Sequence, residues 1–313
     1  MNVIETRGLT KEYRGHTGVA DLSVEIRAGE IYGLLGPNGA GKTTTIRLLV
    51  GLLRPSGGEA RVAGHDVSAE PVAVRSVVGL LPESAGFYGW MTPVEYLCFF
   101  ADLHAMPRGE AGPRIEGLLE RVGLGDRRSS PISTLSRGMR ARLGIARAIV
   151  HRPRVLFFDE PTLGLDPVGQ RDLLRLIQTM NEDEGATIVL SSHALDQVGE
   201  VCARVGIMTD GRLVGQGTAV ELRRQLRLAP TLDVRVAQTD LARRVAVELG
   251  LYARVTVAPH ETVVLTPRDH ELHPEILVRA LVGAGAEVRE VVVREPSLED
   301  VFFAVTQPVR SAA

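Results

Sequence analysis

Residues 36–43 read Gly-Pro-Asn-Gly-Ala-Gly-Lys-Thr, and this stretch constrains the fold more than any other part of the chain. An apolar run at 31–35 precedes it, and apolar residues at helical spacing follow it from Ile46 to Leu52. The order is therefore strand, glycine loop, helix. Glycines let backbone N–H groups converge on a phosphate, and a helix N-terminus adds partial positive charge. The pattern predicts a nucleotide phosphate site on an α/β sheet.

Two side chains in this loop have a predicted task of their own. Lys42, which with Lys11 is one of only two lysines in the chain, supplies a positive charge for the β- and γ-phosphates and is a predicted catalytic residue. The Thr43 hydroxyl is a predicted ligand for Mg²⁺. A glycine-rich turn that binds nothing is the alternative, and the strand and helix around the loop disfavour it. The residues predicted to contact the nucleotide here are Gly36, Pro37, Asn38, Gly39, Ala40, Gly41, Lys42, Thr43 and Thr44.

Two carboxylates follow a second buried strand. Residues 155–158 are all apolar, and Asp159 and Glu160 come directly after them. Ligands collect at the carboxyl ends of strands in open α/β sheets. We therefore expect Asp159 to hold Mg²⁺, directly or through water, and Glu160 to polarise the attacking water as the catalytic base. An acidic turn exposed to solvent is the alternative for this pair taken alone.

Two more polar groups stand at the ends of predicted elements. Ser136 and Gly138 open a helix that runs to Ile149, so a hydroxyl and free N–H groups form a second predicted anion site. The alternative is an ordinary helix cap. His193 follows a strand at 187–190, at the same sheet edge as the carboxylates, and is a candidate for a polar switch beside the phosphate.

The apolar patterns predict two domains. Short β-branched runs separated by glycine turns fill residues 1–53, and residues from about 83 to 149 are mostly helical. Strands that alternate with helices indicate a parallel sheet covered on both faces. After residue 217 the nucleotide motifs stop, and the order β-α-β-β-α-β plus a closing helix predicts a small α+β ferredoxin-like domain. We place the boundary between residues 1–225 and 226–313.

Composition excludes several classes of protein. The net charge of −2 does not indicate a nucleic-acid partner, and two isolated cysteines exclude a disulfide scaffold and a cysteine zinc site. No stretch approaches the roughly 18 apolar residues of a membrane-spanning helix. Acidic residues stand where a signal peptide would have its apolar core. We therefore expect a protein that neither spans the membrane nor is exported.

Taken together, the motifs resemble the ATP-binding subunit of an ABC transporter, over residues 3 to about 220. The resemblance implies a P-loop NTPase fold in which a RecA-like core carries a helical subdomain at about 84–150. It implies an ATPase that uses ATP and Mg²⁺. It also implies that residues 36–43 are the Walker A loop and that Asp159 and Glu160 are the Walker B pair. Ser136 and Gly138 would belong to the signature motif. Asp166 would lie in the D-loop and contact the nucleotide, and His193 would be the catalytic switch histidine.

Tyr13 stands where this family places an aromatic residue that stacks on adenine, and the alternative is a tyrosine of the core or of a turn. Two motifs depart from the family pattern, the signature motif and the Q-loop. Arg137 replaces a glycine of the signature motif, and Met139 replaces its glutamine. Glu83 stands where the family carries the glutamine of its Q-loop. We expect Glu83 to act in catalysis and to bind the metal or its water, although it brings a charge that glutamine lacks.

These departures, with the C-terminal extension that ends in Pro-Ser-Leu-Glu-Asp-Val-Phe-Phe, resemble one branch, the ATPases of ABC-2-type exporters, including those that confer antibiotic resistance. That resemblance implies export of a drug, an antibiotic or a lipid-like compound. It implies two ATPase subunits paired head to tail, either as a homodimer or with a second ATPase, and a separate transmembrane permease. The chain would then lie peripherally on the cytoplasmic face of the cell membrane.

The segment 86–100, rich in aromatic residues, would receive the permease, or else form the core of the helical subdomain. Two other functions stay open at this point. One is a soluble ABC ATPase without a transport role, although the chain carries one cassette and no heptad repeat. The other is a regulatory C-terminal domain that binds a ligand, in which His270 and His273 are spaced as two residues on one helix face.

Overall fold

The computed structural model divides the chain into two units, Met1–Thr218 and Ala219–Ala313. It describes residues 1–194, 199, 201–226, 228–269 and 271–306. The domain boundary predicted after residue 225 lies later in the chain than the observed division, so helix α8 (Ala219–Gln225) belongs to the second unit. Among the described residues, no helix has both the length and the apolarity needed to cross a membrane.

A six-stranded sheet positions the phosphate loop. Its order is β11-β10-β4-β9-β8-β7, with five parallel strands and β11 antiparallel at one edge. Every residue of the three strands β4, β9 and β8 is buried, as expected for strands covered on both faces. The predicted α/β fold is therefore confirmed. The strands are β4 (Ile31–Leu35), β7 (Val78–Leu81), β8 (Val155–Asp159), β9 (Thr187–Ser192), β10 (Arg204–Thr209) and β11 (Arg212–Gly217).

A second, antiparallel sheet is present that the sequence patterns do not predict. Its order is β2-β1-β5-β6, and β3 also pairs with β1. Helix α1 (Lys42–Leu49) contacts both this sheet and β8, and the three elements share one apolar core. Of the short runs in residues 1–53, β1 and β2 pair through a tight turn, whereas the run at 31–35 is β4 of the parallel sheet. The strands are β1 (Asn2–Tyr13), β2 (His16–Leu22), β3 (Glu25–Arg27), β5 (Gly57–Val62) and β6 (His65–Asp66).

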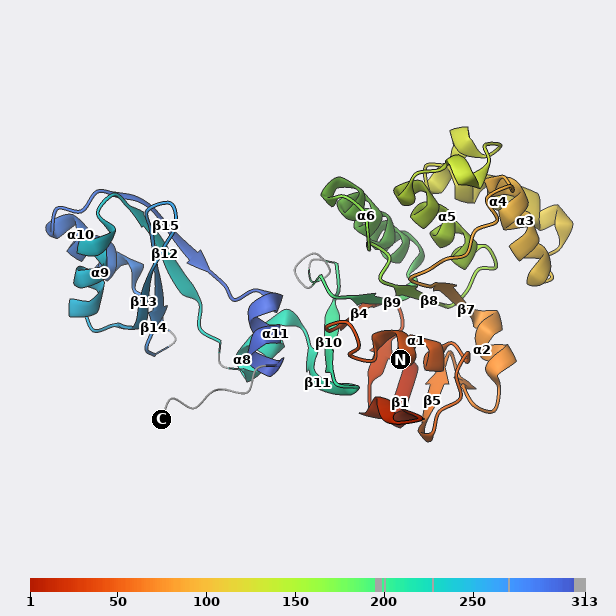
Figure 1. Ribbon diagram of the computed structural model, residues 1–313, viewed down its shortest axis with the longest axis horizontal. Coiled ribbons are helices and arrows are strands. Elements are labelled where there is room, and N and C mark those ends of the chain that lie inside the picture. Colours follow the sequence, from red (N-terminus) through yellow and green to blue (C-terminus); the bar gives the residue numbers. More distant parts are fainter. Residues whose placement is uncertain (195–198, 200, 227, 270, 307–313) are drawn as a thin grey trace. The chain divides into compact units, whose positions relative to one another are not determined.

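The segment 83–149 is mostly helical, as predicted, and two of its helices begin at a polar side-chain cap. Thr92 forms a capping box with Glu95, and the Ser136 hydroxyl accepts a hydrogen bond from the backbone N–H of Met139. Figure 1 shows α3, α4 and α5 grouped together beside β7. The elements are α3 (Pro93–Leu103), α4 (Arg108–Arg121), η1 (Gly125–Arg127), η2 (Ile132–Thr134) and α5 (Arg137–Ile149); α2 (Pro71–Val77) precedes β7, and α6 (Pro167–Glu184) follows β8.

The second unit contains a four-stranded antiparallel sheet in the order β13-β14-β12-β15. This order, with a helix in each of the two crossovers, is the topology expected of a ferredoxin-like domain. Its core is separate from that of the first unit. The elements are β12 (Thr231–Val236), α9 (Thr239–Glu248), β13 (Tyr252–Ala258), β14 (Thr262–Pro267), α10 (Pro274–Gly283), β15 (Val288–Arg294) and α11 (Leu298–Thr306), and α11 contacts α8.

Candidate functional site

The phosphate loop owes its shape to glycine at the start of α1. Gly41 caps this helix with φ of 102°, a left-handed value that side chains rarely adopt. A Cβ atom added to Gly41 would lie 2.5 Å from the carbonyl oxygen of Gly18. The loop can therefore follow this path only with glycine here. The residues at the start of α1 line the cavity described below.

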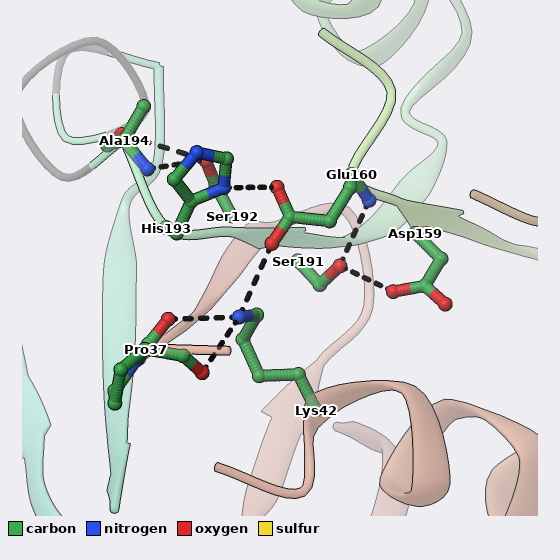
Figure 2. Close-up of polar contacts among 9 residues, drawn as sticks. Pro37, Lys42, Asp159, Glu160, Ser191, Ser192, His193 and Ala194 are labelled. Carbon is green, nitrogen blue, oxygen red and sulfur yellow. Dashed lines mark hydrogen bonds and ion pairs between the residues drawn. The ribbon is translucent and has the colours of Figure 1, made fainter. Parts of the chain in front are cut away.

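Lys42, Glu160 and His193 form one connected polar group (Figure 2). The ammonium of Lys42 lies 3.1 Å from Glu160 Oε1, and both side chains are buried. The other oxygen, Glu160 Oε2, lies 2.8 Å from His193 Nδ1. Lys42 also donates to the backbone carbonyls of Gly36 and Pro37, at 2.8 and 3.2 Å. The structure thus brings together three of the four residues predicted to be catalytic.

Asp159 is held by a residue to which the sequence analysis assigns no role. The Ser191 hydroxyl donates to Asp159 Oδ1 at 2.6 Å and accepts from the backbone N–H of Glu160 at 2.9 Å (Figure 2). From the neighbouring strand β9, Ser191 therefore holds the Asp159 carboxylate and the backbone of Glu160. Glu160 has φ of 50°, a strained value for a residue other than glycine, and such strain concentrates at functional sites. His193, two residues later, is a predicted site residue, but no sequence pattern separates Ser191 from the other polar residues at the end of this strand.

A cavity of about 440 Å³ lies over the phosphate loop and contains most of the predicted site. Its wall also includes His16, Thr17, Gly18 and Leu163, which the sequence analysis does not single out. Gly36, Pro37 and Asp159 do not line it; the first two accept hydrogen bonds from Lys42, and Asp159 accepts one from Ser191. The predicted residues in the wall are Tyr13, Asn38, Gly39, Ala40, Gly41, Lys42, Thr43, Thr44, Glu83, Glu160 and His193.

Tyr13 stands at the edge of this cavity at the end of β1. Its ring stacks on His16 with centroids 5.2 Å apart and planes inclined by 19°. A Cβ added to Gly18 would lie 2.6 Å from the Tyr13 ring, so glycine makes room for the ring. The side chain is 37% exposed, which leaves the ring accessible to a planar ligand.

The second predicted anion site lies in a different cavity, of about 460 Å³. Ser136, Gly138 and Asp166 line it. Ser136 caps α5, and Asp166 caps α6 by accepting from the backbone N–H of Gly169 at 3.2 Å. The start of α5 brings free N–H groups and partial positive charge to this cavity. These three residues are therefore not in the same cavity as the phosphate loop of their own chain.

The oxygen-bearing side chains of the site are suitable ligands for a magnesium ion. Mg²⁺ prefers hard oxygen ligands, few of them from protein, with phosphate oxygens and water completing its shell. The Thr43 hydroxyl and the Glu83 carboxylate line the cavity, and the Asp159 carboxylate is buried and oriented by Ser191. Within the described part of the chain, no cluster of three or more His, Cys, Asp or Glu residues suggests another metal site. His270 lies outside the described residues, and His273 lies near Glu275.

Comparison with known proteins agrees with this geometry. The sequence profile of the family described as ABC transporter matches residues 19–163. The daunorubicin/doxorubicin resistance ATP-binding protein DrrA of Streptomyces peucetius is 38% identical over 97% of this chain and 92% of its own length. The linearmycin resistance ATP-binding protein LnrL of Bacillus subtilis (strain 168) is 32% identical over 97% and 98%.

A solved structure of the ATP-binding subunit of an ABC transporter matches with a TM-score of 0.65 and 31% identity, and it covers 72% of this chain and 94% of its own. The matched share is similar in size to the first unit. Full-length relatives above 30% identity and a matching fold lead to one assignment. The chain belongs to the family of ABC transporter ATP-binding proteins, which are ATPases.

Proposed function

We propose that this protein is the ATP-hydrolysing subunit of an ABC-2-type exporter and that it works as a head-to-tail pair. The observation that carries the proposal is the separation of two anion sites on one unit. The phosphate loop lines one cavity, and Ser136 and Gly138 line another. A phosphate chain bound by the first cavity can reach both kinds of site only if a second ATPase subunit supplies the other. ATP would then hold two positive helix ends together.

Within that pair, the geometry supports hydrolysis by the residues of the polar group. Lys42 would bind the β- and γ-phosphates of ATP. Glu160 would accept a proton from the attacking water, and His193, on its other oxygen, would orient that carboxylate and contact the γ-phosphate. Thr43 and Asp159 would hold Mg²⁺, with Glu83 as a further ligand directly or through water. When bound, the ion would offset the negative charge of the phosphates.

The class of cargo is inferred from the relatives. DrrA and LnrL are named for resistance to daunorubicin/doxorubicin and to linearmycin, and each matches the chain from the first unit into the second. We propose that this protein also drives export of an antibiotic or a similar compound. A separate permease on the membrane would carry the cargo, and this chain would bind its cytoplasmic face.

An exposed aromatic patch is the proposed permease contact. Tyr88, Trp90 and Phe99 are all partly or largely exposed, and Tyr88 packs against the rings of the other two. Tyr96 behind them is buried, so only part of the predicted segment serves the core of the helical subdomain. Accessible aromatic rings are common anchors of protein interfaces. Replacement of Trp90 by Ala should reduce co-purification of the permease, whereas Val72→Ala, at another exposed apolar position, should not.

Transport is tested with the ATPase and the membrane protein of the neighbouring reading frame produced together. Inside-out vesicles from these cells should accumulate a labelled antibiotic only when ATP is present. Vesicles with Glu160→Gln, which keeps the shape of the site, are the matched control and should not accumulate it. If the parent vesicles hydrolyse ATP but accumulate no compound, the ATPase assignment holds and the export proposal is wrong.

A further inference from the structure

The two charged departures from the family pattern, Glu83 and Arg137, face the same cavity. This cavity has a volume of about 270 Å³ and also includes Arg140, Glu160 and Leu163 in its wall. It shares Glu83 and Glu160 with the nucleotide cavity, and Arg137 with the cavity of Ser136. This cavity therefore borders both the nucleotide cavity and the cavity of Ser136 within one chain. Its wall carries both an added negative charge and an added positive charge.

Arg137 has few interactions of its own. Within the described residues its polar contact is a hydrogen bond of 3.4 Å to the backbone carbonyl of Gly164, in the loop that links Glu160 to Asp166. No carboxylate lies within ion-pair distance of its guanidinium in that part of the chain. The guanidinium therefore rests on the loop beside the nucleotide site with its charge uncompensated.

Glu83 is likewise without an ionic partner among the described residues, and it is exposed. Its carboxylate stands in the same cavity wall as that of Glu160. Bound ATP brings several more negative charges into this cavity. A glutamine in place of Glu83 would be neutral, whereas the glutamate adds one more negative charge to a site where Mg²⁺ would already be shared with the phosphates and Asp159. Glu160 has Lys42 and His193 as partners, so the uncompensated carboxylate is Glu83.

We propose that Arg137 is a positioning residue whose charge offsets that of Glu83 when ATP is bound. The inference rests on the proposed nucleotide site. Both side chains are flexible and exposed at the wall of one cavity, so their charges can approach each other as the site fills. The pair would link the nucleotide cavity to the first residue of α5, the helix that carries Ser136. An exposed pair contributes little in water, but its effect grows as bound nucleotide displaces solvent.

The test is a double-mutant cycle on affinity for Mg-AMP-PNP, measured by calorimetry at low salt on the full chain. Arg137→Gln should weaken binding by about fivefold or more when Glu83 is present, and by less than about twofold in the Glu83→Gln background. Arg137→Lys keeps the charge and should bind within about twofold of the parent. In about 0.5 M salt the difference between the backgrounds should shrink, since the interaction is between partly exposed charges.

Arg127→Gln is the matched control, because it removes an exposed charge from the same subdomain outside this cavity. It should leave affinity unchanged in both backgrounds. If Arg137→Gln weakens binding equally with and without Glu83, the residue acts only through the Gly164 carbonyl and the proposed pair is wrong. No effect of Arg137→Gln in either background also overturns it. Failure of every variant and of the parent to bind nucleotide would instead overturn the proposed function, and this inference with it.

Discussion

The ammonium of Lys42 lies 3.1 Å from Glu160 Oε1, with both side chains buried. The lysine predicted to bind phosphate thus also holds the carboxylate predicted to polarise water. A buried carboxylate requires such a partner, because an unpaired charge in a low-dielectric site is very unfavourable. Binding of a phosphate to Lys42 would therefore compete with Glu160 for the same charge. The ion pair connects substrate binding directly to the position of the base.

Lys42→Ala should abolish binding of Mg-ATP, because it removes the mobile positive charge among the amides of the phosphate loop. The chain should still fold, since His193 remains as a partner for Glu160. Calorimetric titration with Mg-ATP and far-UV circular dichroism check the two statements. Arg47→Ala, an exposed change in the same helix α1, is the control and should bind normally. Unchanged ATP affinity in Lys42→Ala would contradict the site assignment.

Ser136→Arg should spare ATP binding to the single subunit but block pairing and hydrolysis. The residue lines a cavity that does not include the phosphate loop, so its contact with ATP would come from the partner. Steady-state ATPase rates and nucleotide titrations separate the two effects. Mixing the variant with Lys42→Ala protein should restore at most one of the two composite sites. A normal turnover rate in Ser136→Arg would rule out the head-to-tail arrangement.

The nucleotide elements could be predicted because local sequence determines them. A buried apolar strand followed by a glycine-rich loop and a helix is typical of a phosphate site. The Ser136 and Thr92 caps follow from side-chain chemistry at helix starts. The second-unit strands were also visible, since their residues alternate between the two sheet faces. In each case the signal lies within about ten neighbouring residues.

The rest depends on contacts between distant segments. The antiparallel sheet joins β1 with β5, and their pairing, such as Glu5 with Arg61, leaves no trace in either strand alone. The role of Ser191 arises because β9 lies beside β8, which brings Ser191 opposite Asp159. The position of Arg137 beside the loop after Glu160 likewise needs the fold. Sequence patterns specify elements, and the packing of the sheet decides which side chains meet.

His151 should make the protein less stable in mild acid. Burial, together with the nearby His104 and Arg114, lowers the pKa of His151 to about 4, against the opposing effect of a hydrogen bond to the Val78 carbonyl. The unfolded chain has an ordinary pKa near 6.5, so below that value unfolding takes up a proton and stability falls as the pH drops toward 4. Between pH 7.5 and 5 the parent should lose about 1 kcal/mol more than His151→Gln, after allowance for solvent screening.

Urea unfolding at the two pH values measures this difference. Glutamine can still donate to the Val78 carbonyl but cannot take up a proton, so His151→Gln isolates the titration. His151 donates through Nε2, and its Nδ1 is buried without a hydrogen-bond partner in the described residues, which leaves no acceptor for a second proton. An equal loss of stability in both proteins would show that other groups account for the acid sensitivity.

Removal of the second unit should leave nucleotide binding intact. A chain that ends after Thr218 keeps the six-stranded sheet, the phosphate loop and a core that contains no residue of the second unit. Affinity for Mg-ATP should stay within about twofold of the full chain, because every residue of the nucleotide cavity is retained. The dimer lifetime and the response to the permease are the properties expected to change. A folded truncation that no longer binds ATP would show that the second unit contributes to the site.

Glu160→Gln should trap the paired state. The amide keeps nearly the same shape as the carboxylate but cannot accept a proton, so hydrolysis should slow by roughly 10²-fold or more while ATP still binds. Without hydrolysis nothing separates the subunits, and gel filtration with Mg-ATP should show a stable dimer. Lys42→Ala should stay mainly monomeric, and Asp159→Asn should disturb the metal before any chemistry, since Ser191 orients that carboxylate rather than the base. Hydrolysis at the parent rate in Glu160→Gln would move the base elsewhere, and Glu83, in the same cavity wall, is the carboxylate to replace next.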